Sequence, residues 1–157
     1  MMGPPWPGRA TLARFPPVST AVMGNSTGAP EKSAALRVLI VDDEPLIRWS
    51  MTETLIAEGH SVMEAGNAKE AILRVSGQPA PDVILLDLYL PDSVDLNLLE
   101  SIRRAAPRSA IVMMTAYGNP EVAAGAIRLG AYRVVNKPLE MGDLATLIQE
   151  AHSSRPQ

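Results

Sequence analysis

The sequence contains no cysteine and only two histidines, His60 and His152, which lie far apart along the chain. The absence of cysteine excludes disulfides, thiolate zinc sites and cysteine nucleophiles. Two scattered histidines do not make a histidine-based metal site. A hard cation bound by oxygen ligands is therefore the class of metal site that the composition leaves open.

Long apolar runs and clusters of basic residues are also missing. No stretch reaches the roughly 18 consecutive apolar residues of a membrane-spanning helix. Without Arg9 and Arg14 of the N-terminal segment, 12 basic side chains stand against 17 acidic ones. The remainder of the chain is therefore acidic, and it has neither a stripe of basic residues nor a helix-turn-helix segment. Both features argue against direct nucleic-acid binding. We therefore expect a cytoplasmic protein that contacts neither membranes nor nucleic acid.

The N-terminal segment, residues 1–34, differs in composition from the rest of the chain. Six of the fourteen prolines fall within the first 30 residues, among Gly, Ser and Thr, and no acid occurs there. No apolar period or secretory signal is present. We predict a disordered extension, either an inert tail or a misassigned start, with a transit peptide as the less favoured alternative.

From Leu36 onward, short β-branched runs alternate with helical patterns, which is typical of repeated βα units. Apolar residues at successive positions favour parallel strands covered on both faces. Asn67 and Asn119 are predicted helix N-caps, and Gly59, Gly77 and Gly130 are predicted left-handed helix ends. The pattern indicates a doubly wound α/β sheet with helices on both faces. The five predicted strands are residues 36–41, 61–65, 82–88, 110–115 and 132–135.

Polar residues end or follow four of these strands, at the sheet edge where ligands bind in this class of fold. Taken singly, each has an ordinary structural explanation, such as a helix N-cap or a solvated lysine. Taken together, three converging acids would repel one another unless a cation lay between them. The residues are Asp42, Asp43, Asp87, Thr115 and Lys137.

Magnesium is the cation that suits such a cluster, because it prefers oxygen ligands and phosphate oxygens. Beside a bound cation, a carboxylate such as Asp87 can attack phosphorus and form an aspartyl phosphate. Lys137 and Thr115 are suited to stabilise phosphate oxygens, by charge and by a hydroxyl hydrogen bond. The cluster therefore predicts a Mg²⁺-dependent phosphoacceptor.

At these positions the chain resembles the receiver domains of two-component response regulators, and its motifs are most similar to those of nitrogen-regulator-type receivers. The resemblance covers residues 35–152 and leaves 153–157 as a short tail. It implies a flavodoxin-like (CheY-like) fold with strand order 2-1-3-4-5. The motifs that carry it are Val38-Leu39-Ile40-Val41-Asp42-Asp43-Glu44, Ile84-Leu85-Leu86-Asp87-Leu88-Tyr89-Leu90-Pro91-Asp92, Met114-Thr115-Ala116-Tyr117-Gly118 and Asn136-Lys137-Pro138-Leu139.

The resemblance also assigns roles to the site residues. Asp87 would be phosphorylated by a histidine kinase or a histidine phosphotransfer protein. Thr115 and Lys137 would sense the phosphate, and the bond before Pro138 would be cis. The implied ligands of Mg²⁺ are Asp42, Asp43, Asp87 and the backbone carbonyl of Tyr89.

Some residues depart from the family pattern or could modify the chemistry. Val134 replaces the usual aromatic three residues before Lys137, and Tyr132 either substitutes for it or packs in the core. Tyr89 and Tyr117 flank the approach of water to the phosphorylated Asp87, so we expect them to modulate dephosphorylation.

The leading interpretation is a signalling switch, not an enzyme, that offers the face of its fourth helix, fifth strand and fifth helix to a target or to a second copy. A receiver detached from a DNA-binding transcriptional regulator is an alternative. A phosphatase similar to haloacid dehalogenases is another, although there the nucleophile ends the first strand. A degenerate receiver that takes no phosphate is the last alternative.

Overall fold

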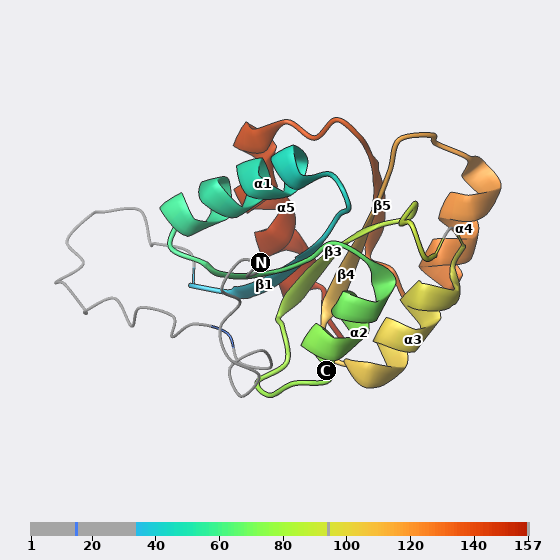
Figure 1. Cartoon of the computed structure of the whole chain (residues 1–157), viewed down its shortest axis with the longest axis horizontal. Helices are drawn as coiled ribbons and strands as arrows, with labels where there is room; N and C mark the ends of the chain where they lie inside the picture. The colour runs from blue at the N-terminus through green and yellow to red at the C-terminus, as the bar shows by residue number, and fades with distance from the viewer. Residues whose placement is uncertain (1–14, 16–33, 94, 157) are drawn as a thin grey trace, which may run out of the picture.

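Five parallel strands form one sheet in the order β2-β1-β3-β4-β5 in the computed structural model, which describes residues 15, 34–93 and 95–156 (Figure 1). This order confirms the expected doubly wound, CheY-like sheet. Each predicted strand is present; one differs from the prediction by one residue at one end, and two differ by one residue at both ends. The strands are β1 (Arg37–Val41), β2 (Ser61–Ala65), β3 (Val83–Asp87), β4 (Ala110–Thr115) and β5 (Arg133–Asn136).

Helices cover both faces of the sheet (Figure 1). The α1 and α5 helices pack together on one face, while α2 and α3 pack together on the other. Right-handed crossovers between parallel strands produce this arrangement. The helices are α1 (Pro45–Ala57), α2 (Ala68–Val75), α3 (Asn97–Ala105), α4 (Pro120–Arg128) and α5 (Met141–Ser153).

The helix ends follow the sequence predictions with one exception. Asn67 accepts a hydrogen bond from the Glu70 N–H, and Asn119 accepts one from the Glu121 N–H, each at 2.8 Å, so both N-caps are confirmed. Gly59 and Gly130 have φ of 94° and 103°, as expected of left-handed helix ends. The prediction for Gly77 was wrong, because this residue does not have a positive φ.

The end of α2 shows why a left-handed glycine is not needed there. The Ser76 hydroxyl donates a hydrogen bond to the Ile72 carbonyl at 2.7 Å, and the Ser76 N–H bonds to the same carbonyl at 3.1 Å. These bonds occupy a carbonyl that the helix end would otherwise leave without a partner. The local turn therefore closes α2 without a change of backbone handedness.

Two apolar cores lie on either side of the sheet, and alternate strand residues point into each. In β3, Ile84 and Leu86 belong to the core beneath α2, α3 and α4. Val83 and Leu85 belong to the core beneath α1 and α5. Every residue of β3 is buried, so the carboxylate of Asp87 stands at the end of a buried central strand.

The predicted N-terminal extension lies outside the described residues, apart from Phe15 and Ala34. Phe15 is buried and belongs to the core beneath α2, α3 and α4. No helix in the described part of the chain is both long and apolar enough to cross a membrane. The Lys137–Pro138 bond is cis, as the resemblance implied, and so is Gln78–Pro79, which the sequence did not indicate.

Candidate functional site

Three carboxylates meet at the edge of the sheet where the strands end. Asp42 and Asp43 follow β1, and Asp87 is the last residue of β3, the neighbour of β1 in the sheet. One oxygen from each carboxylate lies within 4.8 Å of the others. Asp42 and Asp87 are buried, whereas Asp43 is exposed. The predicted convergence of the three acids is therefore confirmed.

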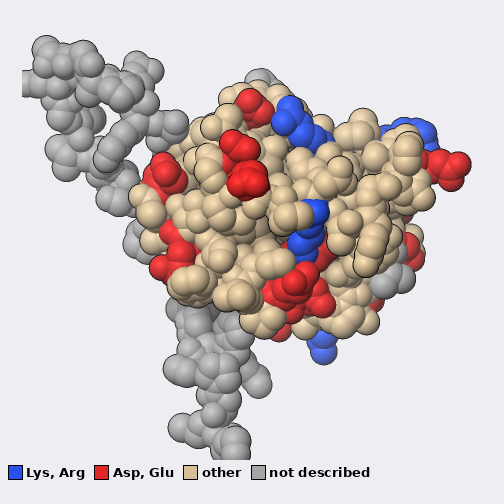
Figure 2. Space-filling view, turned by 90° about the horizontal axis from the view of Figure 1, so that it is seen from above, with Lys and Arg blue, Asp and Glu red and all other residues tan. Residues whose placement is uncertain are grey.

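Lys137, which follows β5, reaches into this group of acids. Its ammonium lies 2.8 Å from Asp42 Oδ2 and 3.0 Å from Asp87 Oδ2, and its side chain is only 9% exposed. Glu44 adds a third contact at 3.3 Å from its exposed side chain. Figure 2, viewed from above Figure 1, shows a group of acidic side chains beside a basic one on a face that is mostly uncharged.

Burial and neighbouring charges shift the pKa values of Asp87 and Lys137. Burial raises the pKa of Asp87, and the nearby Asp42 adds to this, although the Lys137 ammonium and the Tyr89 N–H oppose it. Burial alone would lower the pKa of Lys137, but its hydrogen bonds and charge contacts with Asp42 and Asp87 outweigh that effect and raise the pKa. Lys137 is therefore cationic at neutral pH, and it faces more negative charge than one ammonium neutralises.

This donor set fits a hard divalent cation. It consists of carboxylate oxygens, two of them from largely buried side chains, with no sulfur or imidazole among them. Magnesium favours such ligands and retains some water or phosphate oxygens in its coordination sphere. Asp42, Asp43 and Asp87 are the side chains that could hold it.

Thr115 is buried at the end of β4, the other neighbour of β3. Its hydroxyl donates to the Tyr117 carbonyl at 3.1 Å and lies 3.2 Å from the Tyr117 N–H. The Thr115 carbonyl accepts the Lys137 N–H at 2.8 Å, which ties the ends of β4 and β5 together. The structure thus places the predicted hydroxyl on the strand next to Asp87, engaged with its own loop.

The loop after Thr115 passes close to the Asn136 side chain at Gly118. A Cβ on Gly118 would lie 2.8 Å from Asn136 Oδ1, closer than side chains tolerate. A side chain at this position would therefore require the Asn136 side chain, which precedes Lys137, to move.

Two tyrosines stand at the rim of the site. The rings of Tyr89 and Tyr117 pack edge to face, with centroids 6.1 Å apart. Tyr89 is 40% exposed and Tyr117 is 74% exposed, so both rings face solvent. Tyr132, in contrast, is partly buried against the core beneath α1 and α5, which favours its predicted core role.

Sequence reasoning missed two residues that contact the site. Glu44 pairs with Lys137, and Arg48 on α1 donates to the backbone carbonyl of Asp42 at 2.6 Å. The position of Glu44 directly after the acid pair was a usable signal. Arg48 gave no such signal, because its contact depends on how α1 packs against the sheet.

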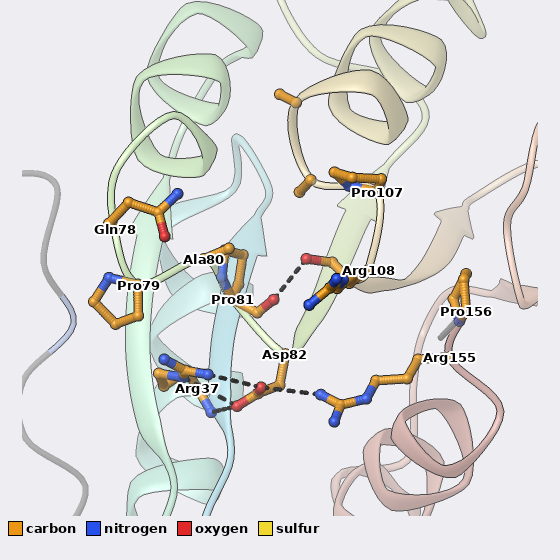
Figure 3. Close-up of a pocket in the computed structure, with 13 residues that line it drawn as sticks. Arg37, Gln78, Pro79, Ala80, Pro81, Asp82, Pro107, Arg108, Arg155 and Pro156 are labelled. Atoms are coloured by element: carbon orange, nitrogen blue, oxygen red, sulfur yellow. Dashed lines mark hydrogen bonds and ion pairs between the residues drawn. The ribbon is translucent and has the colours of Figure 1, made fainter.

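A hollow lies at the opposite edge of the sheet from the acidic site, near the starts of β1, β3 and β4. It has a volume of about 790 Å³. Arg37 and Arg155 converge on Asp82 (Figure 3), and their ion-pair distances to its Oδ1 are 3.0 Å and 3.4 Å. Because Asp82 is already paired with both arginines, we interpret Arg37, Asp82 and Arg155 as a structural ion-pair cluster and call it the Asp82 clasp.

Comparison with known proteins gives consistent matches. Residues 38–149 match the family described as the response regulator receiver domain. The nitrogen assimilation regulatory protein NtrX of Azorhizobium caulinodans is 37% identical over 116 residues, which are 73% of this chain and 25% of that protein. The chain spans about a quarter of the length of the curated relatives it matches.

Solved structures agree with these matches. A CheY-like receiver domain protein from Methanospirillum hungatei JF-1 superposes with a TM-score of 0.71 at 30% identity, covering 76% of this chain and 95% of that one. The beryllofluoride-activated NtrC4 receiver domain dimer gives a TM-score of 0.69 at 32% identity, covering 74% and 96%. These likenesses support the receiver interpretation and give no support to the phosphatase alternative. With its sheet order and its convergent acids, this chain belongs to the receiver domains of two-component response regulators.

Proposed function

We propose that Asp87 accepts a phosphoryl group from a histidine kinase or a histidine phosphotransfer protein in a Mg²⁺-dependent reaction. The observation that carries this proposal is the meeting of Asp42, Asp43, Asp87 and Lys137 at one edge of the sheet. A buried nucleophile beside two further acids and one ammonium suits transfer of an anionic group that arrives with a cation.

The residues have separate roles in this proposal. An oxygen of Asp87 forms the new bond to phosphorus while the bond to the donor imidazole nitrogen breaks, and the imidazole leaves as the neutral group after taking up a proton. Bound Mg²⁺, held by Asp42, Asp43, Asp87 and the Tyr89 carbonyl, would neutralise phosphate oxygens. Lys137 already touches Asp87 and can contact an oxygen of the transferred group.

The chain acts here as phosphoacceptor and not as an enzyme with a separate substrate. A phosphoryl group adds roughly −1.5 to −2 charge units and three acceptor oxygens. These can draw the Thr115 hydroxyl and Lys137 away from their present partners, Tyr117 and Glu44. The loop between β4 and α4 would then change conformation.

Labelling tests the phosphoacceptor role directly. The full chain, incubated with Mg²⁺ and a small acyl phosphate such as acetyl phosphate, should gain one phosphoryl group by intact-mass measurement. Asp87→Asn or EDTA should abolish the gain. Asp82→Asn, a matched carboxylate change at the opposite edge of the sheet, should leave it intact. Phosphate on a serine or threonine would rule the proposal out.

We further propose a cytoplasmic signalling protein whose face of α4, β5 and α5 contacts a target protein or a second copy. A receiver dimer is described for activated NtrC4, at 32% identity to this chain. Arg133 of β5 pairs with Glu150 of α5 at 3.5 Å on this face. The curated relatives are longer than this chain, and some, such as NtrC, are DNA-binding transcriptional regulators. Their length also favours the alternative of a receiver detached from a regulator of that kind.

Oligomeric state tests the self-association part. Sedimentation velocity with Mg²⁺ and beryllofluoride should show a dimer, and Arg133→Glu should weaken it because the substitution reverses a charge on the proposed contact face. Glu53→Arg on α1 is the control and should dimerise normally. A beryllofluoride-bound monomer would favour contact with a different protein.

A further inference from the structure

Arg48 joins three elements around the loop that carries the two adjacent acids. It lies in the first turns of α1, and its Nη1 donates to the Asp42 carbonyl at 2.6 Å. Its Nε donates to Glu64 Oε1 of β2 at 3.1 Å, and its side chain is only 20% exposed. The guanidinium therefore bridges the end of β1 and the edge strand β2 from the side of α1.

Asp42 is held on its other sides as well. Its N–H donates to the Ala65 carbonyl at 3.1 Å, and its Oδ1 accepts the Glu44 N–H at 2.9 Å. Its Oδ2 accepts from Lys137 at 2.8 Å. The Asp42 carbonyl, which Arg48 holds, thus sets the plane of the peptide bond between Asp42 and Asp43.

That next residue is Asp43, the exposed acid of the cluster. Among the described residues, no hydrogen bond or ion pair involves the Asp43 side chain. Because a peptide unit is planar, fixing the Asp42 carbonyl also fixes the direction in which the chain enters Asp43. The position of the Asp43 carboxylate therefore depends on backbone contacts, and Arg48 supplies one of them.

The sequence leaves room for this guanidinium. A Cβ on Gly66, just after β2, would lie 3.3 Å from Arg48 Nη1, tighter than most side-chain contacts. Glycine at this position lets Arg48 pass beside the β2 end to reach Asp42. An alanine there would press on the guanidinium without removing any of its hydrogen-bonding groups.

We propose that Arg48 is a positioning residue for the metal site, holding the Asp42–Asp43 peptide so that both carboxylates face the same cation. This inference rests on the proposed Mg²⁺-dependent function. The alternative is that Arg48 only stabilises the packing of α1 on β2 through its ion pair. The two possibilities differ in what Arg48 substitutions do to Mg²⁺ affinity.

The test is isothermal titration calorimetry of Mg²⁺ into the full chain, paired with thermal unfolding of each variant without metal. Partners of this kind around a metal site typically change affinity 10–100-fold when removed. We expect about a tenfold or larger rise in the Mg²⁺ dissociation constant for Arg48→Ala, in line with that range. Arg48→Lys should fall between wild type and Arg48→Ala, because an ammonium cannot reproduce the planar two-nitrogen contact.

Two milder variants keep the test usable if Arg48→Ala does not fold. Glu64→Gln removes the charge that holds Arg48, and Gly66→Ala crowds it, so both should weaken Mg²⁺ binding. The matched control is Arg37→Ala, which breaks another arginine–carboxylate pair far from the site. It should lower the unfolding temperature while leaving the Mg²⁺ dissociation constant unchanged.

The outcomes separate this inference from the proposed function. Normal Mg²⁺ binding by Arg48→Ala, or equal weakening by Arg37→Ala, would overturn the positioning role and leave the phosphoacceptor role standing. A wild-type chain that binds no Mg²⁺ would overturn both.

Discussion

Lys137 pairs with carboxylates that come from two different strand ends, Asp42 after β1 and Asp87 at the end of β3. One ammonium cannot neutralise three acids, and burial makes the charge of Asp87 unfavourable. The acids of the site are therefore suited to bind a cation, and under the proposed function a phosphoryl group would then add negative charge. Their chemistry explains why the same side chains can serve both.

At the residue scale, Tyr117 should control how long the phosphoprotein lasts. Its ring packs edge to face on Tyr89, whose N–H donates to the Asp87 carboxylate at 3.1 Å, so we expect it to hinder the approach of water to Asp87. We expect Tyr117→Ala to shorten the half-life of phosphorylated protein, measured by loss of the phosphoryl mass over time. Tyr117→Phe keeps the ring and should retain the wild-type half-life. Equal half-lives for Tyr117→Ala and wild type would exclude shielding by this ring.

At the element scale, side chains join elements that are distant in sequence. Asp92, in the loop after β3, accepts hydrogen bonds from the N–H groups of Ala68 and Lys69 at the start of α2, at 2.7 Å and 3.2 Å. Asp82 binds both the backbone and the guanidinium of Arg37 on β1. Each carboxylate thus accepts hydrogen bonds from backbone N–H groups at the start of an element that is distant in sequence.

The Asp82 clasp predicts a definite pH dependence. Burial would raise the pKa of Asp82, but the hydrogen bonds and charge of Arg37 outweigh it and hold the pKa below its usual range. A lowered pKa in the folded state means that the carboxylate stabilises the fold above its unfolded pKa of about 4. That stabilisation is lost as the pH falls through the lower folded value.

Replacement of Asp82 should therefore matter only when the carboxylate is charged. At pH 7, Asp82→Asn should reduce the free energy of unfolding by about 1.5–3 kcal/mol, the usual range for hydrogen bonds to charged groups. The difference from wild type should shrink as the pH falls below about 4. Urea denaturation between pH 7 and pH 3 measures both effects. Exposed Glu53→Gln is the control, and a constant difference at all pH values would contradict this account.

At the scale of the whole molecule, β3 is shared by two cores. Leu85 packs beneath α1 and α5, while Leu86 packs beneath α2, α3 and α4. Since the central strand links both layers, loss of packing on either face should weaken the entire domain. The site at the end of β3 then depends on both cores for its position.

Truncation of either leucine tests this dependence. Leu85→Ala and Leu86→Ala, at residues 0% and 1% exposed, should each lower the free energy of unfolding. The expected loss is about 2–5 kcal/mol for a buried leucine. Leu73→Ala, at a leucine 60% exposed on α2, is the matched control and should change little. Urea denaturation should show one cooperative transition in each case, whereas two separate transitions would show that the layers unfold independently.

The sequence by itself determined the elements and most of the site. Successive apolar residues marked the strands, because strands covered on both faces bury every position. Asn67 and Asn119 were identified correctly as N-caps, since capping depends on neighbouring backbone N–H groups. The motifs ending β1 and β3 also identified the acids, because parallel strands bring their carboxyl ends to one edge.

Only the tertiary structure decided which individual contacts these clustered side chains make. It brought Lys137 to Asp42 across 95 residues of chain, added Glu44 to that ammonium, and placed Arg48 on the Asp42 carbonyl. It also closed α2 at Ser76 without a left-handed glycine. Local patterns encode local hydrogen bonds and burial, whereas contacts between distant side chains depend on how helices and strands pack, and no single segment carries that information.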